Sequence, residues 1–171
     1  MSSRLGPVLE DLLADVVDAL EAACTPVGKS SIETGTIAWD WCCEGHAYVR
    51  VPRIHPSNPF PQQALRQGNC ALPTAVMVEV GVLRCAPTMD NLGNSPDAED
   101  VTASSLEVYD DASTVYEVLR DFQIGNGARA DTVIESWEPF DSQGGCAGGA
   151  WVAWIDPHIC APTCSSFSDE R

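Results

Sequence analysis

The 171-residue sequence predicts an α+β fold, with a mostly antiparallel sheet of about four to five strands and two amphipathic helices packed on one face. Two observations predict it. Two long segments repeat apolar residues at helical spacing, whereas five shorter segments alternate apolar and other residues with period two. Their order is helix, three strands, helix, two strands. We expect residues 1–156 to form one domain, followed by an irregular tail rich in Ser, Pro and Cys over 157–171.

The first helix is predicted over residues 7–24. Apolar residues recur through it at helical spacing, and acidic residues occupy the opposite face. Pro7 suits the first helical position, and Thr25-Pro26 with Gly28 ends the helix.

Three strands are predicted next, over residues 36–42, 46–54 and 74–85. The third has the clearest alternation, because valines stand at every second position from 76 to 82. Pro52 indicates an edge or a strand end in the second. The loop at 55–73 has no periodicity, and loops of that length in compact domains are usually functional or flexible.

The second helix is predicted from about Ser104 to Phe122. We expect Ser104 and Glu107 to form a capping box, and the Gly-Asn-Gly run at 125–127 to end the segment. Its expected buried stripe consists of Leu106, Tyr109, Ala112, Val115, Tyr116 and Leu119. Strands at 132–140 and 150–156 follow.

A glycine-rich run, QGGCAGG at 143–149, separates these last two strands. A phosphate-binding loop would need a lysine after the glycines, yet the single lysine of the chain is Lys29. A dinucleotide loop would need a helix after it, whereas a short aromatic strand follows. The run is therefore interpreted as a hairpin connection.

No catalytic motif is present, since the sequence has neither G-x-S-x-G nor H-E-x-x-H. The histidines His46, His55 and His158 are scattered without a nucleophile at motif spacing. We therefore expect no enzyme activity and no cofactor.

The net charge of −16 opposes adhesion to nucleic-acid phosphates and anionic lipid. One interpretation is that the charge only keeps the protein in solution. The other is that it keeps a polyanion moving past without binding.

Eight cysteines need an explanation. No targeting segment or membrane span is recognisable, so the chain is expected to be soluble, unsecreted and initially reduced. Zinc could be held by four ligands from Cys42, Cys43 and His46 together with His158, Cys160 and Cys164. A late Cys160–Cys164 disulfide is a second alternative. Buried thiols without stoichiometric metal are the expected state of most of the cysteines.

Three segments carry a family resemblance: GHAYVRVPRIHPSNPFP, MVEVGVLRCAP and WEPFDSQGGCAGGAW, in that order after an amphipathic helix. Over about residues 40–156 the chain resembles neck proteins of long-tailed phages that infect actinobacteria, and among them the tail terminators. The positions that resemble the family are Val49, Arg50, Phe60, Pro61, Gly81, Arg84, Gly144, Gly145, Gly148, Gly149 and Trp151.

The resemblance implies a structural virion protein, assembled in the host cytoplasm. It implies a ring, with six copies expected, which ends the tail tube and joins it to the head-side connector. The expected partners are further copies, the major tail tube protein and a head-closure protein, while DNA passes without specific binding. A head-closure (stopper) ring and a zinc-binding module remain alternatives.

Two sets of residues follow as candidates for this role. Acids expected to face the passage are Asp90, Asp97, Glu99 and Asp100, with Asp110 and Asp111 next. Contacts between subunits are expected from Phe60, Pro61 and Leu65 in the long loop.

Overall fold

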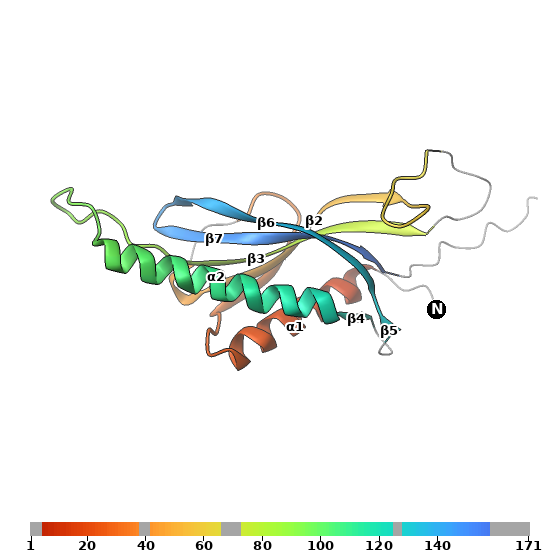
Figure 1. Cartoon of the computed structure of the whole chain (residues 1–171), viewed down its shortest axis with the longest axis horizontal. Helices are drawn as coiled ribbons and strands as arrows, with labels where there is room; N and C mark the ends of the chain where they lie inside the picture. Colours follow the sequence, from red (N-terminus) through yellow and green to blue (C-terminus); the bar gives the residue numbers. More distant parts are fainter. Residues whose placement is uncertain (1–4, 38–41, 66–72, 125–127, 158–171) are drawn as a thin grey trace, which may run out of the picture.

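The computed structural model describes residues 5–37, 42–65, 73–124 and 128–157. A five-stranded sheet runs through it in the order β1-β2-β3-β7-β6 (Figure 1). The strands are β1 (Lys29–Glu33), β2 (His46–Pro56), β3 (Thr74–Cys85), β6 (Asp131–Gln143) and β7 (Cys146–Asp156). Only β1 and β2 pair in parallel, and the other neighbours are antiparallel.

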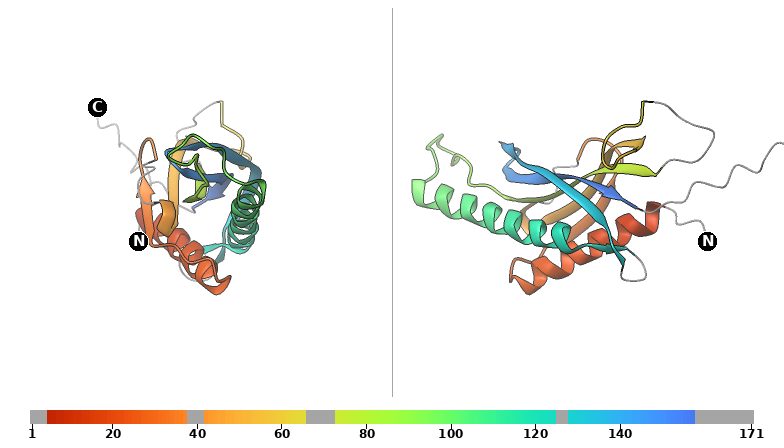
Figure 2. Two further views of the ribbon diagram at one scale, coloured as in Figure 1. Left: turned by 90° about the vertical axis from the view of Figure 1, so that its left-hand side faces the viewer. Right: turned by 45° about the vertical axis from the view of Figure 1, so that its right-hand side comes forward.

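Both helices, α1 (Leu5–Ala22) and α2 (Ala98–Asp121), cover one face of this sheet (Figure 2). Their inner sides meet alternate residues of β3 in one apolar core. That core includes Leu12, Val16, Leu20, Val78, Val80, Val115 and Leu119. The predicted α+β class and the placing of both helices on one face are confirmed.

Several short elements complete the described chain. A 3₁₀ turn, η1 (Cys42–Glu44), precedes β2, and a two-stranded ribbon of β4 (Gln123–Ile124) and β5 (Ala128–Arg129) follows α2. The ribbon was not predicted, because two-residue strands leave no periodic signal.

The prediction of a strand over 36–42 is wrong for the part of this segment that the structure describes. Its described residues are not strand: Thr36 and Ile37 lie outside any element, and Cys42 opens η1. Residues 38–41 lie outside the described ranges. The first strand is instead β1, whose sequence KSSIE is too polar to show an apolar alternation.

Pro52 lies where the sequence analysis expected a strand edge. β1 pairs with β2 only from His46 to Arg50, so the later part of β2 has no described neighbour on that side. The register between β2 and β3 also shifts between Arg50 and Arg53. A residue without an N–H is tolerated at such a position.

The glycine run lies in the β6–β7 hairpin, so the hairpin interpretation is confirmed. Its glycines form the turn and also allow close packing within β7. Gly144 and Gly145 have φ of +62° and +81° and form a two-residue turn between the paired Gln143 and Cys146. Gly149 lies within β7, where a Cβ would collide with the Trp137 ring. The missing side chain therefore lets that ring lie on the strand.

The second helix begins six residues before the expected start. Asp97 occupies the N-cap position, and no side chain caps the helix there. The capping box expected at Ser104 is wrong: its hydroxyl donates to the Cys85 carbonyl at 3.3 Å and ties the helix to the end of β3.

Candidate interaction surface

The outer side of α2 carries large apolar side chains that the sequence analysis placed in the core. Leu106, Tyr109 and Tyr116 are 58%, 57% and 39% exposed. The predicted Ala112, Val115 and Leu119 are buried, and Val108 joins them in the stripe that faces the sheet. The exposed and the buried residues all recur at helical spacing, so periodicity alone could not separate them.

A groove lies between this side of α2 and the strands β6 and β7. It has a volume of about 530 Å³. We call it the α2–β6 groove, and its lining includes Tyr109, Tyr116, Glu117, Arg120, Trp137 and Trp151.

Aromatic rings hold the floor of the groove in place. The Trp151 indole donates to the Ala112 carbonyl of α2 at 2.6 Å. Its ring lies 5.2 Å from that of Tyr116 and 5.8 Å from that of Trp137, centroid to centroid. Such tilted pairs are favourable arrangements of aromatic rings. The groove is thus preformed, apolar at its floor and charged at its rim.

A smaller hollow of about 200 Å³ continues the groove toward the start of α2. Both cavities are lined by Tyr109, and the smaller one also by Val101, Val108 and Phe140. The outer side of α2 therefore offers two hollows that share Tyr109, and serines of α2 also line the smaller one.

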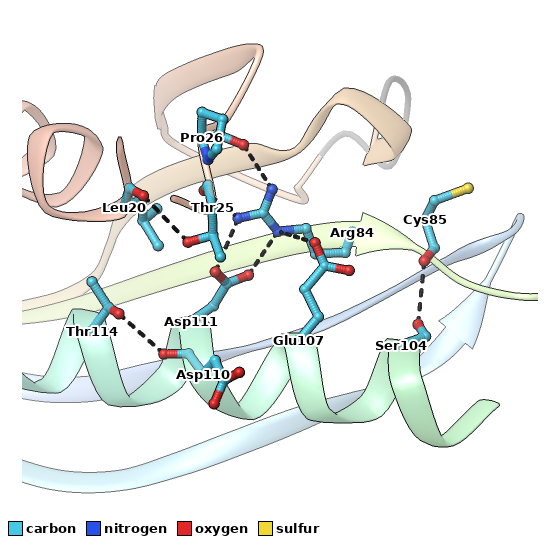
Figure 3. Close-up of polar contacts among 10 residues, drawn as sticks. All are labelled: Leu20, Thr25, Pro26, Arg84, Cys85, Ser104, Glu107, Asp110, Asp111 and Thr114. Atoms are coloured by element: carbon cyan, nitrogen blue, oxygen red, sulfur yellow. Dashed lines mark hydrogen bonds and ion pairs between the residues drawn. The ribbon is translucent and has the colours of Figure 1, made fainter. Parts of the chain in front are cut away.

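Arg84 fixes α2 against the rest of the molecule (Figure 3). From β3 its guanidinium donates to Asp111 of α2 at 2.7 and 2.9 Å. It also donates to the carbonyls of Thr25 and Pro26, just after α1, at 2.6 and 2.8 Å. Glu107 lies 3.7 Å away. One buried side chain therefore joins a strand and both helices.

A second polar network lies on the sheet face opposite the helices. The Tyr48 hydroxyl donates to Glu79 at 2.9 Å, and Arg50 forms an ion pair with the same carboxylate. Burial raises the pKa of Tyr48, and the charge of Glu79 raises it further. Gly81 leaves room for this ring, since a Cβ there would lie 2.6 Å from the tyrosine oxygen.

The candidate passage acids lie at the end of the molecule where the loop before α2 projects (Figure 1). Asp90, Asp97, Glu99 and Asp100 are all exposed. Hydrogen bonds led by that from the Asn94 side chain hold the pKa of Asp90 below its usual value. Asp110 is also exposed.

The prediction that Asp111 faces the passage is wrong. It is buried against Arg84 and is 1% exposed. It therefore cannot line a passage in this structure.

Backbone hydrogen bonds within the candidate contact loop hold its first part in place. Ala64 donates to the Pro56 carbonyl at 2.9 Å, and Asn58 to that of Gln62 at 3.1 Å. Phe60 and Pro61 are half-buried, and a nitrogen of His55 lies 2.9 Å from the Pro61 carbonyl. Leu65 is 97% exposed.

The cysteines depart from the expectation of buried thiols. Cys42 is bonded to Cys146 and Cys43 to Cys85, so both cysteines of η1 are joined to the sheet. Cys85 and Cys146 are register partners on β3 and β7, a pairing across 61 residues that no sequence motif marks. Cys24 is an exposed free thiol.

Cys42 and Cys43, two ligands of the suggested zinc site, are bonded in these bridges. A ring nitrogen of His46 lies 2.7 Å from the Ser31 hydroxyl. His158, Cys160 and Cys164 lie outside the described ranges. Within those ranges, no three or more His, Cys, Asp or Glu residues are placed to hold a metal ion.

No protein-family model and no curated protein matches the sequence. Among solved structures, the chain has a likeness to the sheath/tube terminator of an extracellular contractile injection system in its extended state. The TM-score is 0.32 and the identity 14%, over 90% of this chain and 58% of the terminator. This chain thus spans under two thirds of that protein, and a likeness of this size establishes no shared function. Neither helix is long and apolar enough to cross a membrane in the described part of the chain.

Proposed function

We propose that this chain is a structural subunit of the neck of a long-tailed phage, where its copies form a ring that ends the tail tube. The observation that carries the proposal is the uncovered side of α2. Tyr109 and Tyr116 stand exposed over a preformed aromatic groove, beside a strand with a free edge. Contiguous apolar surface of this kind marks a site of protein association.

The polar groups inside the molecule support a structural role. Arg84 and Asp111 join β3, α1 and α2, while Tyr48, Glu79 and Arg50 join β2 to β3. Each of these two networks thus holds neighbouring elements together. A subunit that must keep its shape within an assembly needs such ties.

The motif positions of the sequence resemblance support the tail assignment because they are positions that the fold requires. Gly81 accommodates Tyr48, Gly149 accommodates Trp137, and Arg84 anchors both helices. On this proposal the partners are further copies, the tail tube protein and a head-side connector, and the location is the virion of a phage of actinobacteria.

The exposed acids before and at the start of α2 face the DNA passage on this proposal. Like charge keeps a passing duplex from adhering. A ring structure with Asp90, Asp97, Glu99 and Asp100 on its outer rim, and neutral or basic side chains inside, contradicts this part alone.

The experiment is to mix the purified chain with tail tubes of the same phage and image their ends by electron microscopy. The proposal predicts a ring of this chain on one end of each tube. Tubes whose ends stay bare at saturating chain concentration contradict it.

A further inference from the structure

One long segment of this acidic chain contains no acidic residue. Residues 45–78 contain three arginines, Arg50, Arg53 and Arg66, and no acidic residue, although the whole chain has 25 acids. Arg50 forms an ion pair with Glu79, whereas Arg53 is exposed. The segment that spans β2, the connection after it and the start of β3 thus differs in charge from the rest of the molecule.

The end of β2 and the connection after it also present apolar side chains to solvent. We name residues 53–65, which begin with the last four residues of β2, the β2–β3 arm. Ile54 and Leu65 in it are 53% and 97% exposed. Three prolines, Pro56, Pro59 and Pro61, restrict its backbone, which lowers the entropy lost when it docks on a partner.

The surface around the α2–β6 groove is acidic, although its lining holds one acid, Glu117, and one base, Arg120. α2 carries seven acids and one base, Arg120. Glu117 lines the groove, and Asp110 on α2 and Glu138 on β6 are exposed. Its floor is formed by tyrosine and tryptophan rings, the lining that proline-rich segments and arginine side chains bind in proteins.

The arm does not occupy the groove of its own chain. No arm residue lines the groove, and Figure 1 shows the end of β2 and the loop after it away from the middle of α2. A single copy therefore has an unfilled groove and an arm whose Arg53, Ile54 and Leu65 side chains are left exposed.

We infer that the β2–β3 arm of one copy docks in the α2–β6 groove of the next. This contact deepens the proposed ring function and rests on it. Because the two surfaces differ, the contact is head-to-tail and leaves a free arm and a free groove at the ends of any open chain. A ring closes when the last arm reaches the first groove.

Two double variants test the contact on the assembled protein. The arm variant is Arg53→Glu with Leu65→Ser, and the groove variant is Tyr116→Ser with Glu117→Lys; all four positions are exposed. Asp18→Lys is the control, since it makes the charge change of Glu117→Lys on the exposed side of α1. Circular dichroism verifies that each variant is folded.

The inference predicts that neither double variant assembles alone on tube ends, whereas the Asp18→Lys control does. An equimolar mixture of the two double variants has one intact arm and one intact groove, so it forms pairs and no rings. Rings from either variant alone overturn the inference and leave the proposed function standing. Bare tube ends with the unaltered chain contradict the proposed function itself.

A peptide of residues 51–65 tests the same contact without assembly. It should quench or shift the tryptophan fluorescence of the unaltered chain, and the groove variant should bind it at least about fivefold more weakly. The Arg53→Glu peptide should bind the unaltered chain more weakly, and should regain affinity for a Glu117→Arg chain. Equal binding of both peptides to all three chains overturns the inference, and so does the absence of binding at millimolar peptide.

Discussion

The buried Arg84 side chain joins β3 to α2 and to the segment after α1. Its side chain is 7% exposed and that of Asp111 1%, so replacing the arginine leaves a buried carboxylate without its partner. We expect Arg84→Met to lower the free energy of unfolding by about 3–5 kcal/mol, measured by urea denaturation.

Arg120→Met is the matched control for this change. Its ion pair with Asp121 is roughly half exposed on both sides, at 49% and 60%, so we expect a much smaller loss than for Arg84→Met. The double variant Arg84→Met with Asp111→Leu should regain part of the stability, because no buried charge is left unpaired. Equal losses for Arg84→Met and Arg120→Met would show that the Arg84 network stabilises nothing beyond a surface pair.

Tyr48 makes stability depend on alkaline pH. Burial and the adjacent Glu79 raise its pKa in the folded chain, whereas the unfolded chain releases the proton near the ordinary value of about 10. Above that pH the folded state binds one proton more, so stability falls as the pH rises. Compared with Tyr48→Phe, the unaltered chain should lose about 1.4 kcal/mol more per pH unit above pH 10.

The measurement is urea denaturation of both chains between pH 8 and pH 11. The difference between them isolates Tyr48 from the other titrating groups. A difference that stays constant over this range would contradict the pH dependence.

At the scale of elements, the β6–β7 hairpin depends on Gly149. A methyl group there collides with the Trp137 ring and lies 2.8 Å from the Glu138 carbonyl oxygen. We expect Gly149→Ala to cost about 1–3 kcal/mol in thermal unfolding and to alter the tryptophan fluorescence. Gly35→Ala is the control, since a Cβ there meets open space and should change stability by less than about 0.5 kcal/mol. Equal effects of the two substitutions would be evidence against the close packing of the ring.

Elements with a single dominant pattern could be predicted from the sequence. β3 and α1 were, because each buries one clear set of apolar residues. α2 was found with half of its predicted stripe buried, whereas Leu106, Tyr109 and Tyr116 are exposed, since only contact with the sheet separates the two sets. β1 was missed because its pairing with β2, and not its composition, makes it a strand.

The candidate site was only partly visible in the sequence. The exposed acids and the contact loop were named from composition and length, and their roles stay predictions. The α2–β6 groove was not foreseen, because it joins Tyr116 and Trp151, which are adjacent only once the hairpin has folded. The disulfides were missed for the same reason: strand register places Cys85 beside Cys146, and η1 brings Cys43 and Cys42 to these two residues.

At the scale of the whole molecule, uncovered surface is the basis of the proposed assembly. The α2–β6 groove and the β2–β3 arm lie apart on one chain, and both leave apolar surface uncovered. On the proposed function, a ring gives each of these surfaces a partner.

Cryo-electron microscopy of the assembled phage particle tests the ring most directly. The predicted result is a closed ring of this chain, with six copies expected, at the junction of tail tube and head-side connector, and with the β2–β3 arm of each copy against α2 of its neighbour. A particle that holds the protein as single copies, or none of it at that junction, would contradict the ring.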